Sequence, residues 1–236
     1  MLKLDIPPKY KAAAVQAAPV FLDLDASVDK ACALIRQAAS QGAKLIALPE
    51  VFLAGGPYWA WHLPMGRGGA FSAELFRNAV EVPGPVVAML GQAAREAEAY
   101  VVIGVNEREG KTLYNTLLYF SPGGELLGKH RKFRPTGPEK LVWGDGDGST
   151  HEVYDTAVGK LGGLIGAAFL SRRGAAKGIG GDHVCARGKI SRVYGAHRVR
   201  MGDVPNIRRS ARGKTRALQH GAHAAVDYDV FLRESV

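Results

Sequence analysis

Residues 44–50 read KLIALPE, a short apolar run followed by a proline and a carboxylate. An apolar run of this length, bounded by Gly42 and Pro49, predicts a strand that is buried on both faces. Strands of this kind belong to layered α/β folds, in which ligands bind in the crevice beyond the carboxyl ends of the strands. Glu50 directly follows the predicted strand, so we expect its carboxylate in that crevice, where a carboxylate can act as a general base.

The segments on either side alternate between predicted strands and helices. Short apolar runs between turn signals predict strands at residues 11–18, 44–48, 100–105, 115–120, 125–129, 151–155 and 160–165. One helix is expected to start at a cap on Asp25 or Ser27 and to end at Gly42, with Val28, Cys32, Ile35 and Ala39 on its apolar face. A second is expected to start at Pro85 and to end at Ala97. This order predicts an α/β fold.

Two further segments are expected to reach the same crevice. Residues 129–134, KHRKFR, form a cluster of cations at the end of a predicted hairpin strand, and an inward-pointing Lys132 could stabilise an oxyanion. The strand GGLI, residues 162–165, should also end there. A thiol at that end would complete an acyl-transfer site with a base, a cation and a nucleophile. The residue that follows is Gly166.

The composition changes at the same point. Residues 1–165 hold 17 Lys and Arg against 17 Asp and Glu, whereas residues 166–236 hold 14 against 5 and account for the net charge of +9. The later segment is rich in Gly and Arg, and apart from a short predicted strand at 227–232 it has no sustained apolar period. We therefore predict two parts: a patterned domain at 1–165, and a basic segment at 166–236 that is poorly ordered or non-native.

The chain as a whole points to a cytoplasmic protein. No apolar run approaches the length of about 20 residues that spans a bilayer, and the N-terminus has no apolar signal segment. Its two cysteines, Cys32 and Cys185, cannot form a disulfide framework.

Four linked blocks between positions 1 and 165 resemble the nitrilase branch of the carbon–nitrogen hydrolase superfamily. They are LPEVFLAGGPYWAW at 48–61, ELFRNAVEVPGP at 74–85, GKHRKFRPTGPEKLVWGDGDGST at 128–150 and GKLGGLI at 159–165. The PYWAW and LVWGDGDGST runs favour nitrilases over the amidase and carbamoylase branches. The resemblance implies an αββα sandwich, here incomplete after residue 165, that pairs into homo-oligomers.

The resemblance also implies the roles of individual residues. Glu50 corresponds to the general base, Lys132 to the cation that stabilises the tetrahedral species, and Glu139 to a second carboxylate that positions substrate and nucleophile. The implied reaction converts a small-molecule nitrile to a carboxylic acid and ammonia without a metal or organic cofactor. In such enzymes the nucleophilic cysteine directly follows Gly-Gly-Leu-Ile, whereas this chain continues Gly166-Ala-Ala-Phe169. We therefore predict that the chain lacks nitrile hydrolysis.

Simpler interpretations exist for several of these residues. Glu50 and Lys132 could be solvated surface charges, and Glu139 could cap a helix or form an ion pair. His130 is predicted to lie on the surface, and Arg131 and Arg134 are predicted to be surface or interface charges. The aromatic residues Tyr58, Trp59 and Trp61 could line a substrate pocket, but core packing or oligomer contact is the commoner use of such a cluster.

The two cysteines do not replace the missing nucleophile. Cys32 lies on the apolar face of a predicted helix, so we expect it to pack in the core. Cys185 has His183 and Arg187 nearby, which could lower its pKa. It comes well after position 166, where the nucleophile is expected, in a stretch without a predicted strand.

Two hypotheses account for the basic segment. Gly181–Arg187 can be encoded so that a shift of one base gives Glu-Ile-Met-Tyr-Ala-Pro, a run resembling a later part of the family, which suggests a frame-shifted nitrilase gene. Sequencing the gene across codons 160–190 tests this. Alternatively, a non-catalytic hydrolase-like domain carries a nucleic-acid-binding arm, since Arg208, Arg209, Arg212, Lys214 and Arg216 could contact phosphates. This run lacks the interleaved aromatic residues of a stacking surface, which disfavours nucleic acid as a partner.

Overall fold

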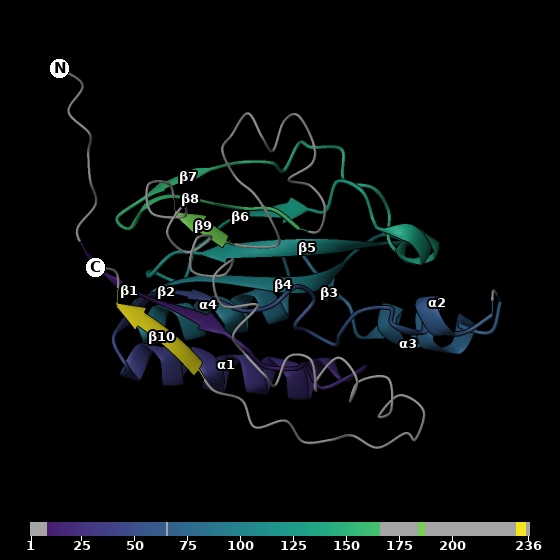
Figure 1. The fold of residues 1–236 in the computed structure, drawn as a ribbon, viewed down its shortest axis with the longest axis horizontal. Helices are drawn as coiled ribbons and strands as arrows, with labels where there is room; N and C mark the ends of the chain where they lie inside the picture. The colour runs from purple at the N-terminus through teal and green to yellow at the C-terminus, as the bar shows by residue number, and fades with distance from the viewer. Residues whose placement is uncertain (1–8, 65, 166–183, 187–229, 235–236) are drawn as a thin grey trace, which may run out of the picture.

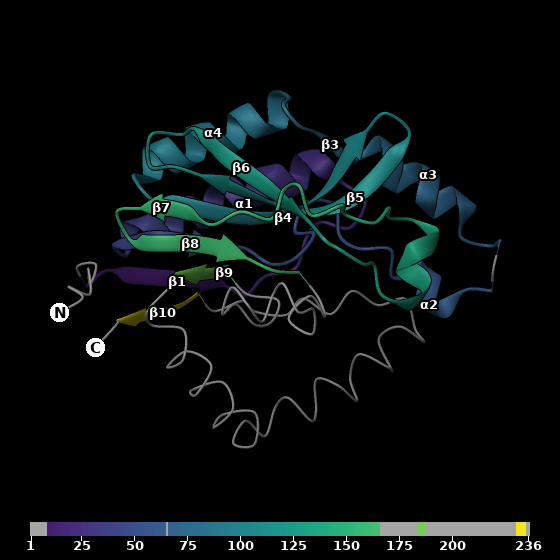
Figure 2. The same cartoon turned by 90° about the horizontal axis from the view of Figure 1, so that it is seen from above.

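A large mixed β-sheet has two long helices on one face and a smaller sheet on the other (Figures 1 and 2). The computed structural model describes residues 9–64, 66–165, 184–186 and 230–234. Within this part of the chain, none of the helices is long and apolar enough to cross a membrane.

Among the described residues the large sheet has seven strands, in the order β10-β1-β2-β4-β5-β6 with β3 also paired to β4. Its strands are β1 (Lys11–Val15), β2 (Ala43–Ala47), β3 (Val80–Glu81), β4 (Tyr100–Glu109), β5 (Thr112–Phe120), β6 (Leu126–Arg131) and β10 (Val230–Glu234). The strands β1, β2 and β4 run parallel, and β4, β5 and β6 form an antiparallel meander. The parallel half therefore aligns the carboxyl ends of β1, β2 and β4 at one edge of the sheet.

The smaller sheet is antiparallel and consists of β7 (Tyr154–Thr156), β8 (Gly159–Gly163) and β9 (Val184–Ala186). The helical elements are α1 (Leu24–Ser40), α2 (Trp59–His62), α3 (Gly69–Arg77), α4 (Pro85–Ala97) and the 3-10 helix η1 (Gly137–Leu141). Helices α1 and α4 cover the large sheet, while α2, α3 and η1 lie at one end of the molecule (Figure 1). These layers are the α, β and β layers of the sandwich that the family resemblance implies.

Alternating side chains of the large sheet build one core on each face. The face under the helices carries Ile46, Ile103 and Phe120, which pack against apolar residues of α1 and α4. The opposite face carries Leu45, Val102, Leu117 and Tyr119, which pack against the smaller sheet. The continuous apolar runs of the central strands follow from this burial on both sides.

Helix α1 is capped earlier than the sequence predicted. The Asp23 carboxylate accepts a hydrogen bond from the Ala26 backbone N–H at 2.9 Å, so neither Asp25 nor Ser27 is the cap. Ser27 is buried instead, and its hydroxyl donates to the Val20 carbonyl at 2.9 Å. The apolar face contains Val28, Cys32 and Ile35 as expected.

The predicted strands are confirmed with different ends, and the helix at Pro85 is confirmed with the ends that were predicted, Pro85 and Ala97. Strand β4 continues to Glu109 and β5 begins at Thr112, because polar residues within them have partners on neighbouring strands. The prediction that 184–186 lacks a strand was wrong, since these residues form β9. The expected strand at 227–232 overlaps β10 at 230–232. The boundary at Gly166 and most of the basic segment lie outside the described residues.

Candidate active site

Glu50 lies in a tight turn directly after β2, and this turn packs against β4. The Leu48 N–H donates to the Val102 carbonyl at 2.8 Å, and the Gly104 N–H donates to the Pro49 carbonyl at 3.2 Å. The next residue, Val51, has a φ of 43° although it is β-branched and buried. Such a conformation is strained for a β-branched residue and occurs where surrounding contacts enforce it.

Gly104 sets how closely this turn approaches β4. A Cβ atom added at Gly104 would lie 2.5 Å from the Pro49 carbonyl oxygen and 2.6 Å from the Glu50 Cα, both within the backbone of the turn. Only glycine therefore allows the turn to sit against the sheet.

Replacing Gly104 with alanine is expected to displace the turn and to lower the free energy of unfolding by about 1–3 kcal/mol, the usual cost of overpacking. Urea denaturation followed by circular dichroism measures this loss. Gly69→Ala is the control for a glycine-to-alanine change, because Gly69 has no positive φ and a Cβ there meets nothing within 4 Å. If Gly104→Ala is no more destabilising than Gly69→Ala, the close approach is not a constraint.

Lys132 follows β6 and points into the molecule, with 4% of its side chain exposed. Its backbone N–H donates to the Asn115 carbonyl at 2.8 Å, and its carbonyl accepts from the Gly146 N–H at 2.9 Å. The strand pairing is thus continued by one residue beyond β6, which places Lys132 opposite Asn115.

Glu50, Lys132 and Glu139 converge on one ammonium group. Lys132 Nζ lies 3.0 Å from Glu50 Oε1 and 3.0 Å from Glu139 Oε2. Asn115 Nδ2 donates to the same Glu50 oxygen at 2.5 Å. Glu139 is held by η1, where its carboxylate also accepts from the Thr136 N–H at 2.7 Å in a capping box.

The electrostatics keep this lysine charged. Burial alone would lower the pKa of Lys132, but the charges and hydrogen bonds of Glu50 and Glu139 outweigh burial and raise it. With both carboxylates ionised, the cluster carries a net charge of −1, and its cation is fixed in place between them. A buried, oriented ammonium group of this kind can stabilise negative charge that develops on a bound molecule.

Comparison of the chain with known proteins identifies its family. The family profile for the carbon-nitrogen hydrolases matches residues 11–168. The chain belongs to the carbon-nitrogen hydrolase family. A nitrilase of Bacillus sp. (strain OxB-1) is 48% identical over 157 residues, which are 66% of this chain and 46% of that protein. Nitrilase 1 of Arabidopsis thaliana is 47% identical over 156 residues, which are 64% of this chain and 45% of that protein.

Solved structures show the same fold. An amidase from Nesterenkonia sp. AN1 superimposes with a TM-score of 0.56 at 20% sequence identity, covering 74% of this chain and 64% of the amidase. A carbon-nitrogen hydrolase superfamily protein from Xanthomonas campestris gives 0.52 at 21% identity, covering 66% and 53%. This chain spans about half the length of the curated relatives it matches.

In this carbon-nitrogen hydrolase the three site residues predicted from the sequence lie together. The position predicted for the nucleophile, residue 166, lies outside the described residues. Strand β8 leads toward that position. Ile165, just beyond β8, is buried against Leu45, Val102 and Leu117 on the inner face of the large sheet.

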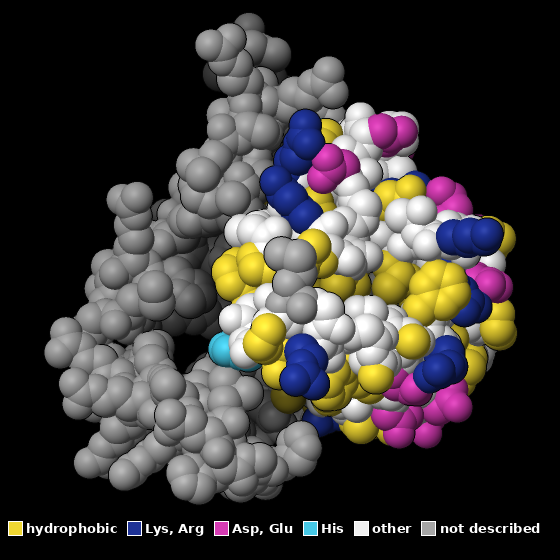
Figure 3. Space-filling view, turned by 90° about the vertical axis from the view of Figure 1, so that its right-hand side faces the viewer, with side chains coloured by type: hydrophobic (Ala, Val, Ile, Leu, Met, Phe, Trp, Pro, Cys, Tyr) yellow, Lys and Arg dark blue, Asp and Glu magenta, His cyan; other side chains and the backbone are white. Residues whose placement is uncertain are grey.

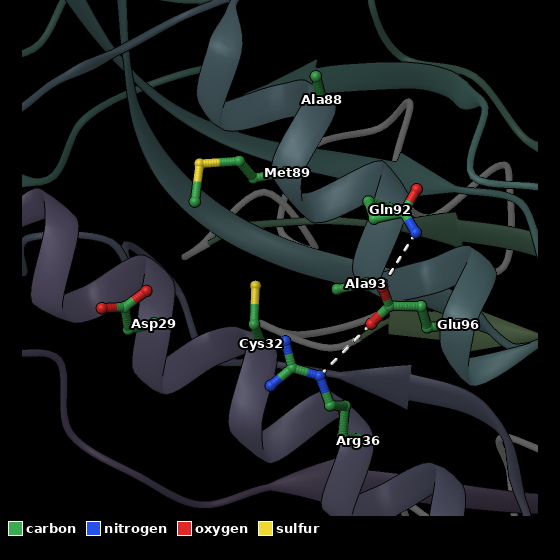
Figure 4. Close-up of a pocket in the computed structure, with 8 residues that line it drawn as sticks. All are labelled: Asp29, Cys32, Arg36, Ala88, Met89, Gln92, Ala93 and Glu96. Carbon is green, nitrogen blue, oxygen red and sulfur yellow. Dashed lines mark hydrogen bonds and ion pairs between the residues drawn. The ribbon is translucent and has the colours of Figure 1, made fainter.

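Cys32 does not serve this site. It lies under the opposite face of the large sheet, in a shallow groove between α1 and α4 that is bordered by Asp29, Met89 and the Arg36–Glu96 ion pair (Figure 4). Burial is the main cause that raises the pKa of its thiol, so the nucleophilic thiolate is disfavoured. The prediction that Cys32 packs in the core is confirmed. The Cys185 side chain lies outside the described atoms, and its role stays a prediction.

Of the residues predicted for the surface, His130 is buried and Arg131 is partly buried, with 14% of its side chain exposed. His130 is 1% exposed because it points between the sheets, where it contacts the rings of Phe133 and His151. Arg131 points to the other face and binds the buried carboxylate of Glu107 through two nitrogens, at 2.9 and 2.6 Å. Arg134 lies on the surface as predicted, paired with Asp145.

The aromatic cluster divides between core and surface. Trp59 is buried and stacks on Phe71 at 5.5 Å, so it packs in the core at this end of the molecule. Tyr58 and Trp61 are about half exposed, and Trp61 contacts the start of η1 at Gly137. Apolar side chains are interspersed with charged ones over this end (Figure 3).

Sequence reasoning missed Asn115 and Glu107. Both are fully buried polar residues in otherwise apolar strands. Asn115 faces Glu50, while Glu107 binds Lys129, Arg131 and Thr116 on the helix-covered face. A polar residue that interrupts an apolar strand pattern was the available signal.

Proposed function

We propose that this chain carries the base and the cation of a nitrilase-type active site and lacks its nucleophile. The observation that carries the proposal is the position of the Lys132 ammonium, 3.0 Å from the carboxylates of both Glu50 and Glu139. The strained Val51 beside Glu50 supports it, because such strain is concentrated at functional sites.

In the complete reaction Glu50 removes the proton from a thiol at the end of β8, and the thiolate attacks the nitrile carbon to give a thioimidate. Addition of one water and loss of ammonia leave a thioester, and a second water releases the carboxylic acid and regenerates the thiol. Lys132 stabilises the negative charge of the tetrahedral species, and Glu139 holds Lys132 in position. No step requires a metal or an organic cofactor.

A nitrile is favoured over an amide as the ancestral substrate. The relatives at 45–48% identity carry the name nitrilase, whereas the amidase with a similar fold is about 20% identical. We also propose that residues 1–165 are the N-terminal part of a carbon-nitrogen hydrolase domain, that the protein forms homo-oligomers when folded, and that it resides in the cytoplasm.

The chain itself is proposed to be inactive. Gly166 stands at the position of the expected cysteine, and glycine has no side chain that could attack a nitrile. The basic segment that follows supplies no thiol next to the matched blocks, since its one cysteine is at position 185.

A chimera tests the assigned roles. Residues 1–165 are joined to the segment that follows the matched region in the Bacillus nitrilase, and ammonia release from nitriles is measured. The chimera is expected to hydrolyse nitriles, and Glu50→Gln to reduce turnover by about 10²–10⁴-fold, as for loss of a general base. Lys132→Met should likewise lower turnover.

Glu98→Gln is the matched control, because Glu98 forms an exposed ion pair with Lys44 and should leave turnover unchanged. An active chimera that tolerates Glu50→Gln as well as Glu98→Gln would refute the role of Glu50.

A further inference from the structure

Asn115 occupies a position between the two charged groups of the site. It lies on β5, is 1% exposed, and shares the inner face of the sheet with Leu117 and Tyr119. Its side-chain nitrogen donates to Glu50 Oε1, while its backbone carbonyl accepts from the Lys132 N–H at 2.8 Å. One residue therefore contacts the base through its side chain and the cation through its backbone.

The orientation of the Asn115 amide is fixed by charge. Turning the amide over would bring Oδ1 against the Glu50 carboxylate, and two acceptors would then repel each other. In the observed orientation Oδ1 is buried without a hydrogen-bond partner in the part of the chain that the structure describes. A buried acceptor without a partner is unfavourable, so the bond to Glu50 is the interaction that accounts for an asparagine here.

A neighbouring asparagine, Asn106, supports the backbone that follows Glu50. Asn106 on β4 is paired in register with Asn115, and its side chain donates to the carbonyls of Leu53 at 3.0 Å and Gly55 at 2.8 Å. It also accepts from Trp143 Nε1 at 3.0 Å. Asn106 thus holds the backbone beyond Glu50, and Asn115 contacts the carboxylate itself.

We propose that Asn115 is a positioning residue that orients the Glu50 carboxylate toward Lys132, a role that rests on the proposed function of these two groups. Its amide occupies one lone pair of Glu50 Oε1 and leaves the ammonium of Lys132 as the second partner of that oxygen. Without the amide, Glu50, which is 30% exposed, is free to turn toward solvent and to release Lys132.

The test uses the full chain and the ¹⁵N–¹H signal of the Lys132 ammonium, assigned by its loss in Lys132→Met. Asn115→Leu keeps the approximate volume and removes the donor, so the signal is expected to shift or broaden. Asn115→Asp has the same shape and donates to Glu50 only when the pair holds a proton. The Lys132 ammonium signal of this variant should resemble the parent's near pH 4, where the two facing carboxylates share a proton. It should depart from the parent's toward about pH 8, where that proton is lost.

Thr116→Val is the control, because it removes a buried hydroxyl from the same strand on the opposite face and should preserve the parent signal. If Asn115→Leu fails to fold, the pH comparison within Asn115→Asp decides. An Asn115→Asp signal that matches the parent's at both pH values would overturn the proposal. Because the signal reports geometry rather than turnover, it is independent of whether the chimera hydrolyses nitriles.

Discussion

The purified 236-residue chain is expected to release no ammonia above the buffer blank from a panel of aromatic and aliphatic nitriles. Removing the nucleophile of an enzyme that works through a covalent intermediate lowers turnover by on the order of 10⁶. In the proposed mechanism Glu50 and Lys132 polarise a bound molecule, but neither forms the covalent intermediate on which that reaction depends. A colorimetric ammonia assay at high protein concentration measures the residual rate.

Restoring the thiol alone is not expected to rescue the reaction. Gly166→Cys adds the missing sulfur but leaves the following Ala-Ala-Phe and the basic segment unchanged. A nucleophile must be held within a fraction of an ångström of its productive position, and that position depends on the residues around it. Ammonia release from the single variant Gly166→Cys would show that the later segment is not a foreign sequence.

The second large effect is on stability and concerns Glu107. This residue is 1% exposed and forms ion pairs with Lys129 and Arg131, the latter through two nitrogens. Arg131 also lies over the Tyr114 ring at 3.9 Å. Glu107→Ala leaves two cations without their central carboxylate, and breaking a buried pair in this way costs about 3–5 kcal/mol. Urea denaturation of parent and variant gives the difference.

Glu81→Ala is the matched control on an adjacent strand. Glu81 pairs with Arg108 at 2.8 Å but is 61% exposed, so its loss should cost no more than about 1 kcal/mol. A Glu107→Ala effect as small as that of Glu81→Ala would mean that the cluster is screened by solvent like a surface pair.

The ion pairs of Glu107 should also make the free energy of unfolding depend on pH. Burial favours the protonated form of Glu107, but the hydrogen bonds of Arg131, Lys129 and Thr116 outweigh burial and lower its pKa. A carboxyl whose pKa is lowered by folding stabilises the fold above its unfolded value of about 4.3, and this contribution is lost as the pH falls through the folded pKa. The unfolding free energy of the parent should therefore fall more steeply below about pH 4 than that of Glu107→Gln.

The strands and the long helices could be predicted because each has a local signature, whereas Glu139 was named only through the family resemblance. The catalytic roles of Glu50, Lys132 and Glu139 stay predictions. Residues 44–50 show a buried strand followed by a carboxylate, and Pro85 starts a helix of good formers. The partners of these residues could not be predicted in the same way. His130 and Arg131 look like surface charges beside Lys132, and only the pairing of β6 with β5 places them on opposite faces of the sheet.

The cap of α1 and the role of Asn115 depend on contacts between distant segments. Ser27 has the residue type of a cap but is used to tie the Val20 and Ala54 backbone, so Asp23 takes the capping role. Asn115 lies close to Glu50 in space only because β2 and β5 both pair with β4, so that a single strand lies between them. Sequence pattern gives the elements, and the register between them gives the site.

Intact-mass spectrometry of the protein after incubation with a nitrile tests the central claim most directly. A thiol within reach of Glu50 and Lys132 would form a covalent thioimidate, which adds the mass of one nitrile to the chain. We predict an unchanged mass for this chain, and for the chimera an adduct when turnover is stopped with acid while nitrile is still in excess. A stoichiometric adduct on the unmodified chain would mean that it supplies its own nucleophile, and the proposal that it lacks one would then be wrong.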